Sequence, residues 1–144
     1  MLEPLTSAEQ LEDAGVSLGH CLRAGDVVAL SGDLGAGKTT FARGVLRGLG
    51  HRGEVPSPTF TLVQPYETVP PVWHVDLYRL AGPAEADGLG LWETDAALLI
   101  EWPERLGGEL PAEALLVHID GSGTSTRRLT VSAPPSWEGR WPQT

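Results

Sequence analysis

The sequence predicts an α/β fold in which a mixed, mostly parallel β-sheet is flanked by helices. Two observations support this prediction. Short apolar stretches typical of strands alternate with stretches of helical periodicity, and a glycine-rich segment joins one such strand to the next helix. A chain of 144 residues is long enough for one domain with one core. We assign residues 1–133 to this domain and residues 134–144, with two tryptophans among prolines and polar residues, to a C-terminal tail.

The individual elements follow from periodicity and from the residues that interrupt it. Thr6 and Ser7 are suited to cap a first helix, which Gly25 ends. The helical segments expected after it are 39–49, a Gly- and Pro-interrupted stretch 81–91, and a short helix within 103–110. The expected strands are 26–31, 59–66, 72–77 and 97–102, followed by a hairpin of 115–120 and 128–133.

The segment from Gly32 to Thr39 reads Gly-Asp-Leu-Gly-Ala-Gly-Lys-Thr and matches the phosphate-binding loop pattern G-x-x-x-x-G-K-[ST]. Lys38 is the only lysine of the chain, and the other nine basic residues are arginines. A compact ammonium group fits inside a tight backbone loop better than a planar guanidinium does. Because a strand precedes the loop and a helix follows it, backbone N–H groups and the helix dipole would converge on a phosphate. The sequence therefore predicts a nucleoside triphosphate site.

This loop predicts the individual ligands of the nucleotide. Lys38 would reach the β- and γ-phosphates, Thr39 would offer its hydroxyl to Mg²⁺, and Thr40 is placed to reach the α-phosphate. The remaining nucleotide-binding residues predicted in the loop are Asp33, Leu34, Gly35, Ala36 and Gly37.

Two apolar strands end in carboxylates, which a P-loop enzyme needs to hold or polarise the shell of its Mg²⁺ ion. One strand ends in Asp76 and the other in Glu101, and spacing alone does not decide between them. Thr59 leaves a second choice open. Its hydroxyl either reaches Mg²⁺ or the γ-phosphate, as a switch residue does, or belongs to an ordinary turn entering a strand.

Four segments in combination resemble the TsaE (formerly YjeE) family of small bacterial ATPases, which are required for forming threonylcarbamoyladenosine on tRNA. They are Gly32 to Phe41, Ser57 to Thr61, His74 to Arg79 and Ile100 to Glu104. The resemblance implies that the chain binds ATP and Mg²⁺ and docks on a TsaB–TsaD heterodimer, so that it meets tRNA only through that complex. It also implies roles for single residues: phosphate and Mg²⁺ binding for Lys38 and Thr39, hydrolysis for Asp76, proximity to the metal for Glu101, a switch role for Thr59, and a position beside the nucleotide for Trp102.

Phosphoryl transfer is catalysed mainly by positioning and by charge neutralisation. This chemistry is compatible with the residue roles that the resemblance implies. We assign three catalytic residues: Lys38 to the phosphates, Asp76 to the attacking water and Glu101 to the Mg²⁺ shell, with the reverse assignment of the two carboxylates left open. No arginine is obviously an arginine finger, and Arg79, three residues beyond Asp76, is the nearest candidate. A missing finger predicts slow intrinsic hydrolysis that a partner accelerates. Arg43 and Arg47, one helical turn apart, are expected to form a solvated face.

Three other functions remain as alternatives. A small-molecule kinase would need an acceptor pocket and usually an arginine-rich lid, and the sequence shows no such arginine cluster. A guanine-specific GTPase would need an Asn-Lys-x-Asp element, which a chain with one lysine at Lys38 does not contain. A non-hydrolysing adaptor would use nucleotide binding alone as its switch.

Composition bounds the partners and the compartment. The formal net charge is −9 and no basic run extends beyond Arg127-Arg128, so tight unaided binding to nucleic acid is not expected. The apolar runs are too short to span a membrane, and the acidic N-terminal region does not resemble a secretory signal. A single cysteine, Cys21, fits a reducing cytoplasm and is expected to be a packed thiol. We therefore expect a cytoplasmic protein without a membrane partner.

Overall fold

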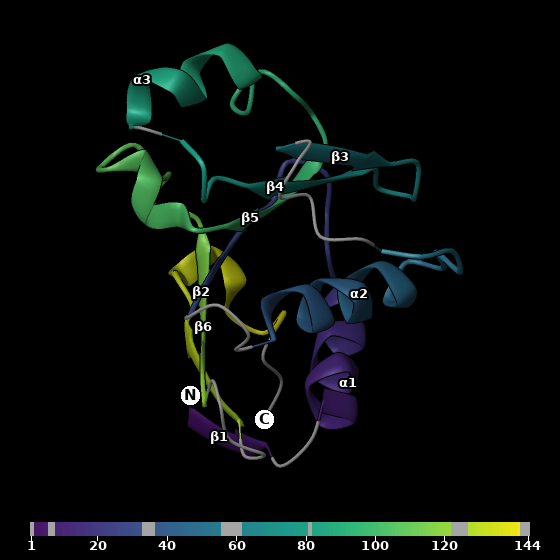
Figure 1. The fold of residues 1–144 in the computed structure, drawn as a ribbon. Helices are drawn as coiled ribbons and strands as arrows, with labels where there is room; N and C mark the ends of the chain where they lie inside the picture. Colours follow the sequence, from purple (N-terminus) through teal and green to yellow (C-terminus); the bar gives the residue numbers. More distant parts are fainter. Residues whose placement is uncertain are drawn as a thin grey trace.

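In the described part of the chain, the strands form one seven-stranded sheet in the order β1-β7-β6-β2-β5-β4-β3 (Figure 1). The computed structural model describes residues 2–5, 8–32, 37–55, 62–80, 82–121 and 127–141. The strands are β1 Leu2–Leu5, β2 Val27–Ser31, β3 Val63–Tyr66, β4 Val72–Asp76, β5 Ala97–Glu101, β6 Leu115–Asp120 and β7 Arg127–Ser132. The central strands β6, β2, β5 and β4 are parallel, whereas β7 and β3 run antiparallel to their neighbours. The predicted mixed, mostly parallel sheet is confirmed.

Helices cover the two faces of this sheet unequally. The helices α1 (Ala8–Gly19) and α2 (Lys38–Gly48) lie together on one face (Figure 1). The other face is covered near β4 and β5 by α3 (Pro83–Ala86) and the 3₁₀ turns η1 (Asp87–Leu89) and η2 (Pro103–Leu106). A third 3₁₀ turn, η3 (Pro135–Trp137), lies near the end of the chain. No helix of the described residues is both long and apolar enough to cross a bilayer.

The alternation of side chains along β5 explains why the core has two parts. All five residues of β5 are buried, as expected for a central parallel strand covered on both faces. Leu99 joins the larger cluster, which contains the apolar residues of α1 and α2. Leu98 and Ile100 join the smaller cluster under α3 and η2. Residues of β4 and β5 that alternate with the smaller cluster therefore face α2.

Several elements differ in extent from the sequence prediction. The helical stretch expected over 81–91 is only α3 and η1, and η1 stops before Gly90, which has a φ of 69°. The helix expected within 103–110 is the 3₁₀ turn η2, which stops before Gly107 at a φ of 61°. The first residues expected in the strand 59–66, like Thr6 and Ser7, lie outside the described residues. Strand β1 was not predicted.

Two pairs of glycines allow α1 and α2 to pack with their backbones in contact. A Cβ atom placed on Gly15 would overlap the carbonyl oxygen of Phe41, and one placed on Gly44 would overlap the carbonyl oxygen of Glu12. Gly19 and Gly48 meet the opposite helix in the same way, one turn further along. Because the obstructing atoms are backbone, no side-chain rotation relieves the overlap. The close approach of the two helices therefore depends on glycine at these four positions.

Replacing Gly44 by alanine should therefore lower the free energy of unfolding by about 1–3 kcal/mol, the usual cost of overpacking. The helix propensity of alanine does not compensate, because the added methyl group meets a carbonyl oxygen of α1. Chemical denaturation measures the change. Gly88→Ala is the matched control, since a Cβ atom there meets nothing within 4 Å, and its effect should stay within about 0.5 kcal/mol. Equal stabilities of the two variants would contradict the packing argument.

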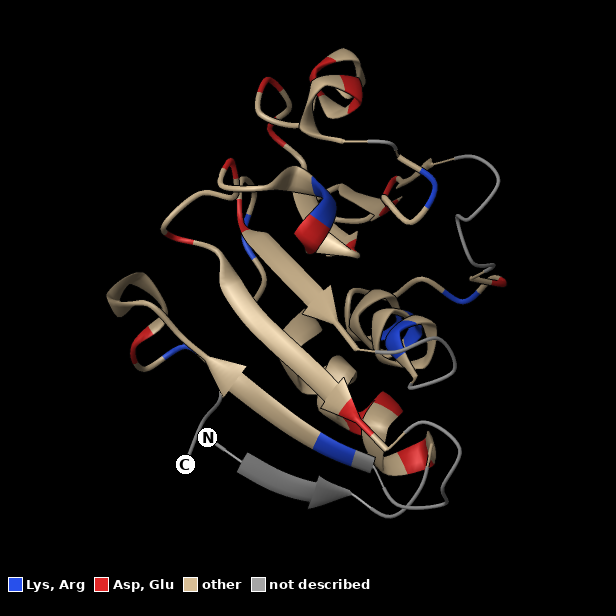
Figure 2. Ribbon diagram, turned by 60° about the vertical axis from the view of Figure 1, so that its left-hand side comes forward, with Lys and Arg blue, Asp and Glu red and all other residues tan. Residues whose placement is uncertain are grey.

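Charged side chains also join the two helices. Arg43 and Arg47 of α2 bind the two carboxylate oxygens of Glu12 on α1, at 3.8 and 3.1 Å respectively. Both arginines are partly exposed, as expected for a solvated face, and both also bridge to the neighbouring helix. Acidic residues are spread over several loops and helices of the fold (Figure 2).

The tail packs against the body of the protein through its two tryptophans. Trp137 and Trp141 are 2% and 4% exposed. The Trp141 ring meets Phe41 of α2 edge-to-face, and its indole N–H donates to the hydroxyl of Ser17 on α1 at 3.2 Å. Residues 134–141 therefore contribute to the same core as the two long helices.

An ion pair fastens the tail to the start of β2. Arg140 donates to both carboxylate oxygens of Asp26, at 2.6 and 3.4 Å, and to the backbone oxygen of Cys21 at 3.0 Å. Its guanidinium also lies 4.0 Å from the ring centre of Trp137. Burial raises the pKa of the Cys21 thiol, which contacts the carbonyl oxygen of Leu18, so this thiol is packed in the way the sequence indicates.

Candidate nucleotide site

The described residues on either side of residues 33–36 are arranged as a phosphate-binding loop requires, with a strand before and a helix after. The strand ends at Ser31 and the helix begins at Lys38, immediately after Gly37. Gly37 has a φ of 113°, which favours glycine, and its carbonyl oxygen accepts the first helical hydrogen bond, from Phe41, at 2.9 Å. A Cβ atom at Gly37 would also overlap the side chain of Leu11. Strand, glycine turn and helix start thus follow in the predicted order.

The ammonium group of Lys38 lies beside the end of β2, at the start of α2. The residue is 5% exposed, and Nζ donates to the carbonyl oxygen of Gly32 at 2.6 Å. Nζ also lies 4.3 Å from the centre of a Trp102 ring, a cation–π distance. The charge is therefore fixed between the end of β2 and the residue that follows β5.

The two predicted carboxylates lie side by side at the carboxyl ends of parallel strands. Asp76 ends β4, Glu101 ends β5, and the two residues are partners in the strand register. Each is 3% exposed. The hydroxyl of Thr39 lies 3.4 Å from Glu101 Oε2, and the backbone N–H of Tyr78 donates to Asp76 Oδ1 at 2.9 Å. The fold thus gathers Lys38, Thr39, Asp76 and Glu101, which are separated in sequence, around the start of α2.

Other predicted residues are placed differently. Thr40 is partly buried in the first turn of α2, and Arg79 is exposed in the turn after β4. The remaining predicted nucleotide ligands, Asp33, Leu34, Gly35, Ala36 and Thr59, lie outside the described residues.

One buried residue of the site carried no role in the sequence prediction. His74 of β4 is fully buried, and its Nε2 lies 2.5 Å from Oε2 of Glu101. Alternation along the strand was the available signal, because it places His74 on the same face as Asp76. The sequence alone did not show that the ring reaches across to the neighbouring strand.

The backbone at Trp102 is strained, with a φ of 62° that few non-glycine residues adopt. Its N–H donates to the carbonyl oxygen of Leu30 on β2 at 3.3 Å, and its ring contacts that of Tyr78 at a centroid distance of 4.9 Å. These contacts hold the indole beside Lys38. Such strain is often found where a fold fixes a functional side chain.

The donor atoms near the start of α2 suit a magnesium ion. Mg²⁺ prefers oxygen ligands, and it is commonly held by one or two protein oxygens together with substrate phosphates and water. The Thr39 hydroxyl and the Glu101 carboxylate supply such oxygens at adjacent positions. Within the described ranges no three His, Cys, Asp or Glu side chains gather as a metal site of their own. The Thr39 and Glu101 oxygens are thus of the kind that could hold Mg²⁺ together with phosphate and water ligands.

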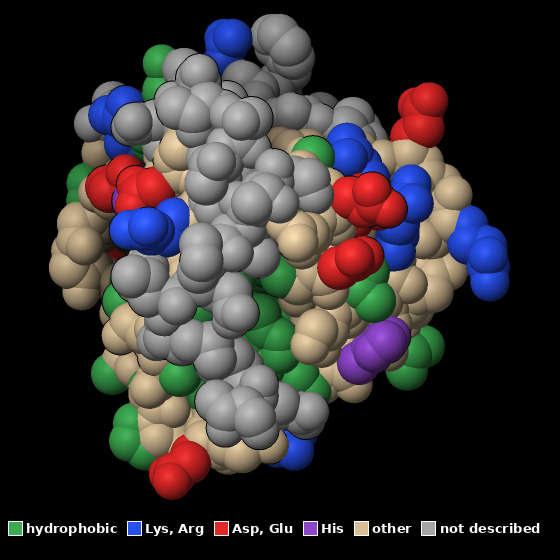
Figure 3. Space-filling model, turned by 90° about the horizontal axis from the view of Figure 1, so that it is seen from below, with side chains coloured by type: hydrophobic (Ala, Val, Ile, Leu, Met, Phe, Trp, Pro, Cys, Tyr) green, Lys and Arg blue, Asp and Glu red, His purple; other side chains and the backbone are tan. Residues whose placement is uncertain are grey.

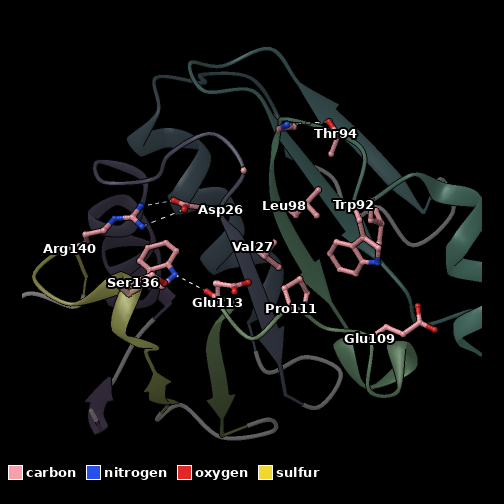
Figure 4. A pocket seen from close by; sticks show the side chains of 14 residues that line it. Asp26, Val27, Trp92, Thr94, Leu98, Glu109, Pro111, Glu113, Ser136 and Arg140 are labelled. Carbon is pink, nitrogen blue, oxygen red and sulfur yellow. Dashed lines mark hydrogen bonds and ion pairs between the residues drawn. The ribbon is translucent and has the colours of Figure 1, made fainter.

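A cavity of about 420 Å³ lies at the amino-terminal ends of the central strands, opposite to the ends that carry Asp76 and Glu101 (Figure 4). Val27 and Leu98, from the amino ends of β2 and β5, line it together with the partly exposed Trp92. The ion pair of Asp26 and Arg140 closes one side, as Figure 4 shows. None of the predicted nucleotide ligands that the structure describes, Gly37 to Thr40, lines this cavity, and neither Asp76 nor Glu101 does.

Comparison with known proteins identifies the family to which this chain belongs. The family model described as threonylcarbamoyl adenosine biosynthesis protein TsaE matches residues 5–129. The chain belongs to the TsaE family. Among curated TsaE proteins, that of Haemophilus influenzae is 51% identical over 98 residues, which are 65% of this chain and 62% of the relative. The TsaE of Streptomyces coelicolor is 43% identical over 132 residues, which are 85% of this chain and 89% of the relative.

A solved TsaE-like fold extends the comparison to three dimensions. The crystal structure of Bacillus subtilis YdiB superposes with a TM-score of 0.80 at 30% identity, covering 96% of this chain and 88% of YdiB. The TsaE-family fold of this chain is thus of the P-loop NTPase type. The residues of this chain that align with the TsaE of Haemophilus influenzae span less than two-thirds of that relative's length.

Proposed function

We propose that this TsaE-family chain is an ATPase that hydrolyses ATP to ADP within the machinery forming N6-threonylcarbamoyladenosine on tRNA, next to the anticodon. The observation that carries the proposal is the convergence of Lys38, Thr39, Asp76 and Glu101 at the start of α2. Two buried carboxylates and one buried ammonium group are costly to keep in a fold without a use for them. Phosphoryl transfer requires such a set of charges at fixed positions.

Each residue of the set has a distinct task in the proposed reaction. Lys38 neutralises charge on the β- and γ-phosphates, where its ammonium group would exchange the Gly32 carbonyl for phosphate oxygens. Thr39 and Glu101 would hold Mg²⁺, which when bound neutralises phosphate charge. Asp76, the register neighbour of Glu101, orients the attacking water and accepts its proton.

We further propose that the chain works in the cytoplasm, docked on a TsaB–TsaD-like heterodimer, and meets tRNA only through that complex. The net charge of −9 supports this, because direct tRNA binding would require a basic surface. On the face seen in Figure 3, basic side chains lie next to acidic ones. Arg79, the nearest candidate for an arginine finger, lies at an exposed position in the turn after β4.

Phosphate release distinguishes the proposed ATPase from a small-molecule kinase. ATP incubated with the chain and a TsaB–TsaD pair should yield ADP and free phosphate in equal amounts, with no metabolite added as acceptor. A kinase would form little free phosphate until an acceptor is supplied. A nucleotide-dependent adaptor would bind ATP and release none under either condition.

Replacing Asp76 by asparagine should leave nucleotide affinity within a few-fold of the parent and reduce hydrolysis by about 10²- to 10⁴-fold. The amide keeps the size of the side chain but does not accept a proton from water, and loss of a general base has effects of this order. Calorimetric ATP binding and phosphate release measure the two properties separately. Asp95→Asn, at an exposed position, is the control. Parental hydrolysis by the Asp76 variant would show that another residue orients the water.

A further inference from the structure

His74 is a buried histidine placed to act on Glu101. It lies on β4 two residues before Asp76, so alternation directs both side chains to the face that α2 covers. Its partner in the strand register is Leu99 of β5, but the ring extends along the sheet to the next residue on that face. There Nε2 lies 2.5 Å from Oε2 of Glu101, and both side chains are almost completely buried.

The two ring nitrogens of His74 have different surroundings, and these define the tautomer. An ionised carboxylate only accepts hydrogen bonds, so Nε2 must carry the proton that Glu101 receives. Nδ1 is buried and has no hydrogen-bond partner among the described residues. Leaving such a polar atom unpaired is unfavourable, because the atom loses its hydrogen bonds to water on burial. A leucine would fill this position without that cost, so the contact with Glu101 is the property that distinguishes histidine here.

Both hydrogen bonds that the described residues give to Glu101 converge on the same oxygen. Thr39 approaches Oε2 from the start of α2, and His74 approaches it from the neighbouring strand. No described residue donates to Oε1. The two donors therefore fix the rotation of the carboxylate, with Oε2 held and Oε1 left for another ligand.

We infer that His74 is a positioning residue: its Nε2–H holds Oε2 of Glu101, so that the carboxylate presents Oε1 to the Mg²⁺ shell. The consequence for hydrolysis rests on the function proposed above, whereas the hydrogen bond itself does not. Partners of metal ligands in other proteins act in this way, and losing one typically lowers metal affinity or activity about 10- to 100-fold. His74 touches neither phosphate nor water in this account and acts only through Glu101.

Two substitutions separate the hydrogen bond from the volume of the side chain. His74→Gln keeps an N–H donor at a similar reach, whereas His74→Leu keeps an apolar side chain of similar size and no donor. His20→Gln is the matched control, because His20 is exposed at the end of α1. Mn²⁺ affinity of each protein–ADP complex, measured by electron paramagnetic resonance, reports on the site without catalysis. The Mg²⁺ dependence of phosphate release reports on the same site during turnover.

The leucine variant should bind Mn²⁺ about 10- to 100-fold more weakly and need correspondingly more Mg²⁺, with metal-free ADP affinity little changed. The glutamine variant should recover most of this loss. Parental Mn²⁺ affinity in a folded His74→Leu protein, or no Mn²⁺ binding by the parent complex, would overturn the inference. If the parent binds Mn²⁺ but releases no phosphate even with partners, the proposed ATPase fails while the role of His74 stands.

A spectrum of the unmodified protein tests the hydrogen bond even if His74→Leu does not fold. In ¹⁵N-labelled protein, His74 should show the Nε2-protonated tautomer with a slowly exchanging, downfield-shifted proton. Glu101→Gln should move this signal, and His20→Gln should not. A ring protonated on Nδ1 alone would contradict the inference, because Nε2 would then have no proton to donate.

Discussion

Replacing Lys38 by alanine is expected to weaken ATP binding by about 30- to 150-fold. A hydrogen bond between charged partners contributes about 2–3 kcal/mol, and 1.4 kcal/mol corresponds to a factor of ten in Kd. The chain has no other lysine, and the ammonium group of Lys38 is buried at the junction of β2 and α2, so no neighbouring amine takes its place. Isothermal titration calorimetry with ATP and Mg²⁺ measures the loss directly.

Two further variants show whether the loss comes from this position or from charge in general. Arg47→Ala removes a half-exposed cation from the same helix, one that binds Glu12, and should leave ATP affinity unchanged. Lys38→Arg keeps the charge but adds a planar group where the side chain is 5% exposed, so it should also bind ATP weakly. ATP affinity of the Lys38→Ala protein equal to that of the parent would refute the assignment of the phosphate site.

Replacing Trp137 by alanine is expected to lower the free energy of unfolding by about 3–5 kcal/mol, as for other buried tryptophans. The side chain is 2% exposed, and its indole N–H donates to the carbonyl oxygen of Glu113 at 3.2 Å. The guanidinium of Arg140 also stacks on its ring while binding Asp26. Losing the ring therefore leaves a cavity and weakens the attachment of the tail. Urea denaturation followed by circular dichroism measures the change.

Trp92 provides the matched control for this substitution. It is 42% exposed at the cavity shown in Figure 4, so Trp92→Ala should cost less than about 1 kcal/mol. Similar losses in the two variants would mean that the tail contributes no more to stability than an exposed aromatic residue does. A tail with no structural role would predict no loss for Trp137→Ala.

The parts of the fold that the sequence predicted are those with a local signature. Strand β2 ends at Ser31 and α2 begins at Lys38, so the strand, the glycine-rich sequence and the helix lie within one short stretch of the chain. The strands ending in Asp76 and Glu101 are short apolar runs, and parallel strands bring their carboxyl ends to the same end of the sheet. Predicting that the two carboxylates lie side by side therefore requires only the assumption that these two strands are neighbours.

Contacts between distant segments were not predictable in this way. Strand β1 contains Pro4 and is recognisable as a strand only by its antiparallel pairing with β7. It lies at one edge of the sheet, and β3, with Pro65, lies at the other, because an edge tolerates the missing N–H of proline. The burial of Trp137 likewise depends on residues far back in the chain.

Side-chain geometry also supports our proposal of which carboxylate lies nearer the metal. The 3.4 Å contact with Thr39 supports placing Glu101 beside the metal, and the contact of His74 with the same oxygen strengthens that placement. Alternation along β4 indicated which face His74 occupies, but neither the length of the reach nor the orphaned Nδ1 follows from a one-dimensional pattern.

The central claim is that this chain hydrolyses ATP at the start of α2, and phosphate release by the purified protein tests it most directly. Release should be measured from the chain alone, with a TsaB–TsaD pair, and with that pair plus tRNA, using Lys38→Ala as the blank. We predict slow release by the chain alone, a marked increase with the pair, and none above background from the blank. No release from the parent in any of the three mixtures, or equal release from the blank, would contradict the claim.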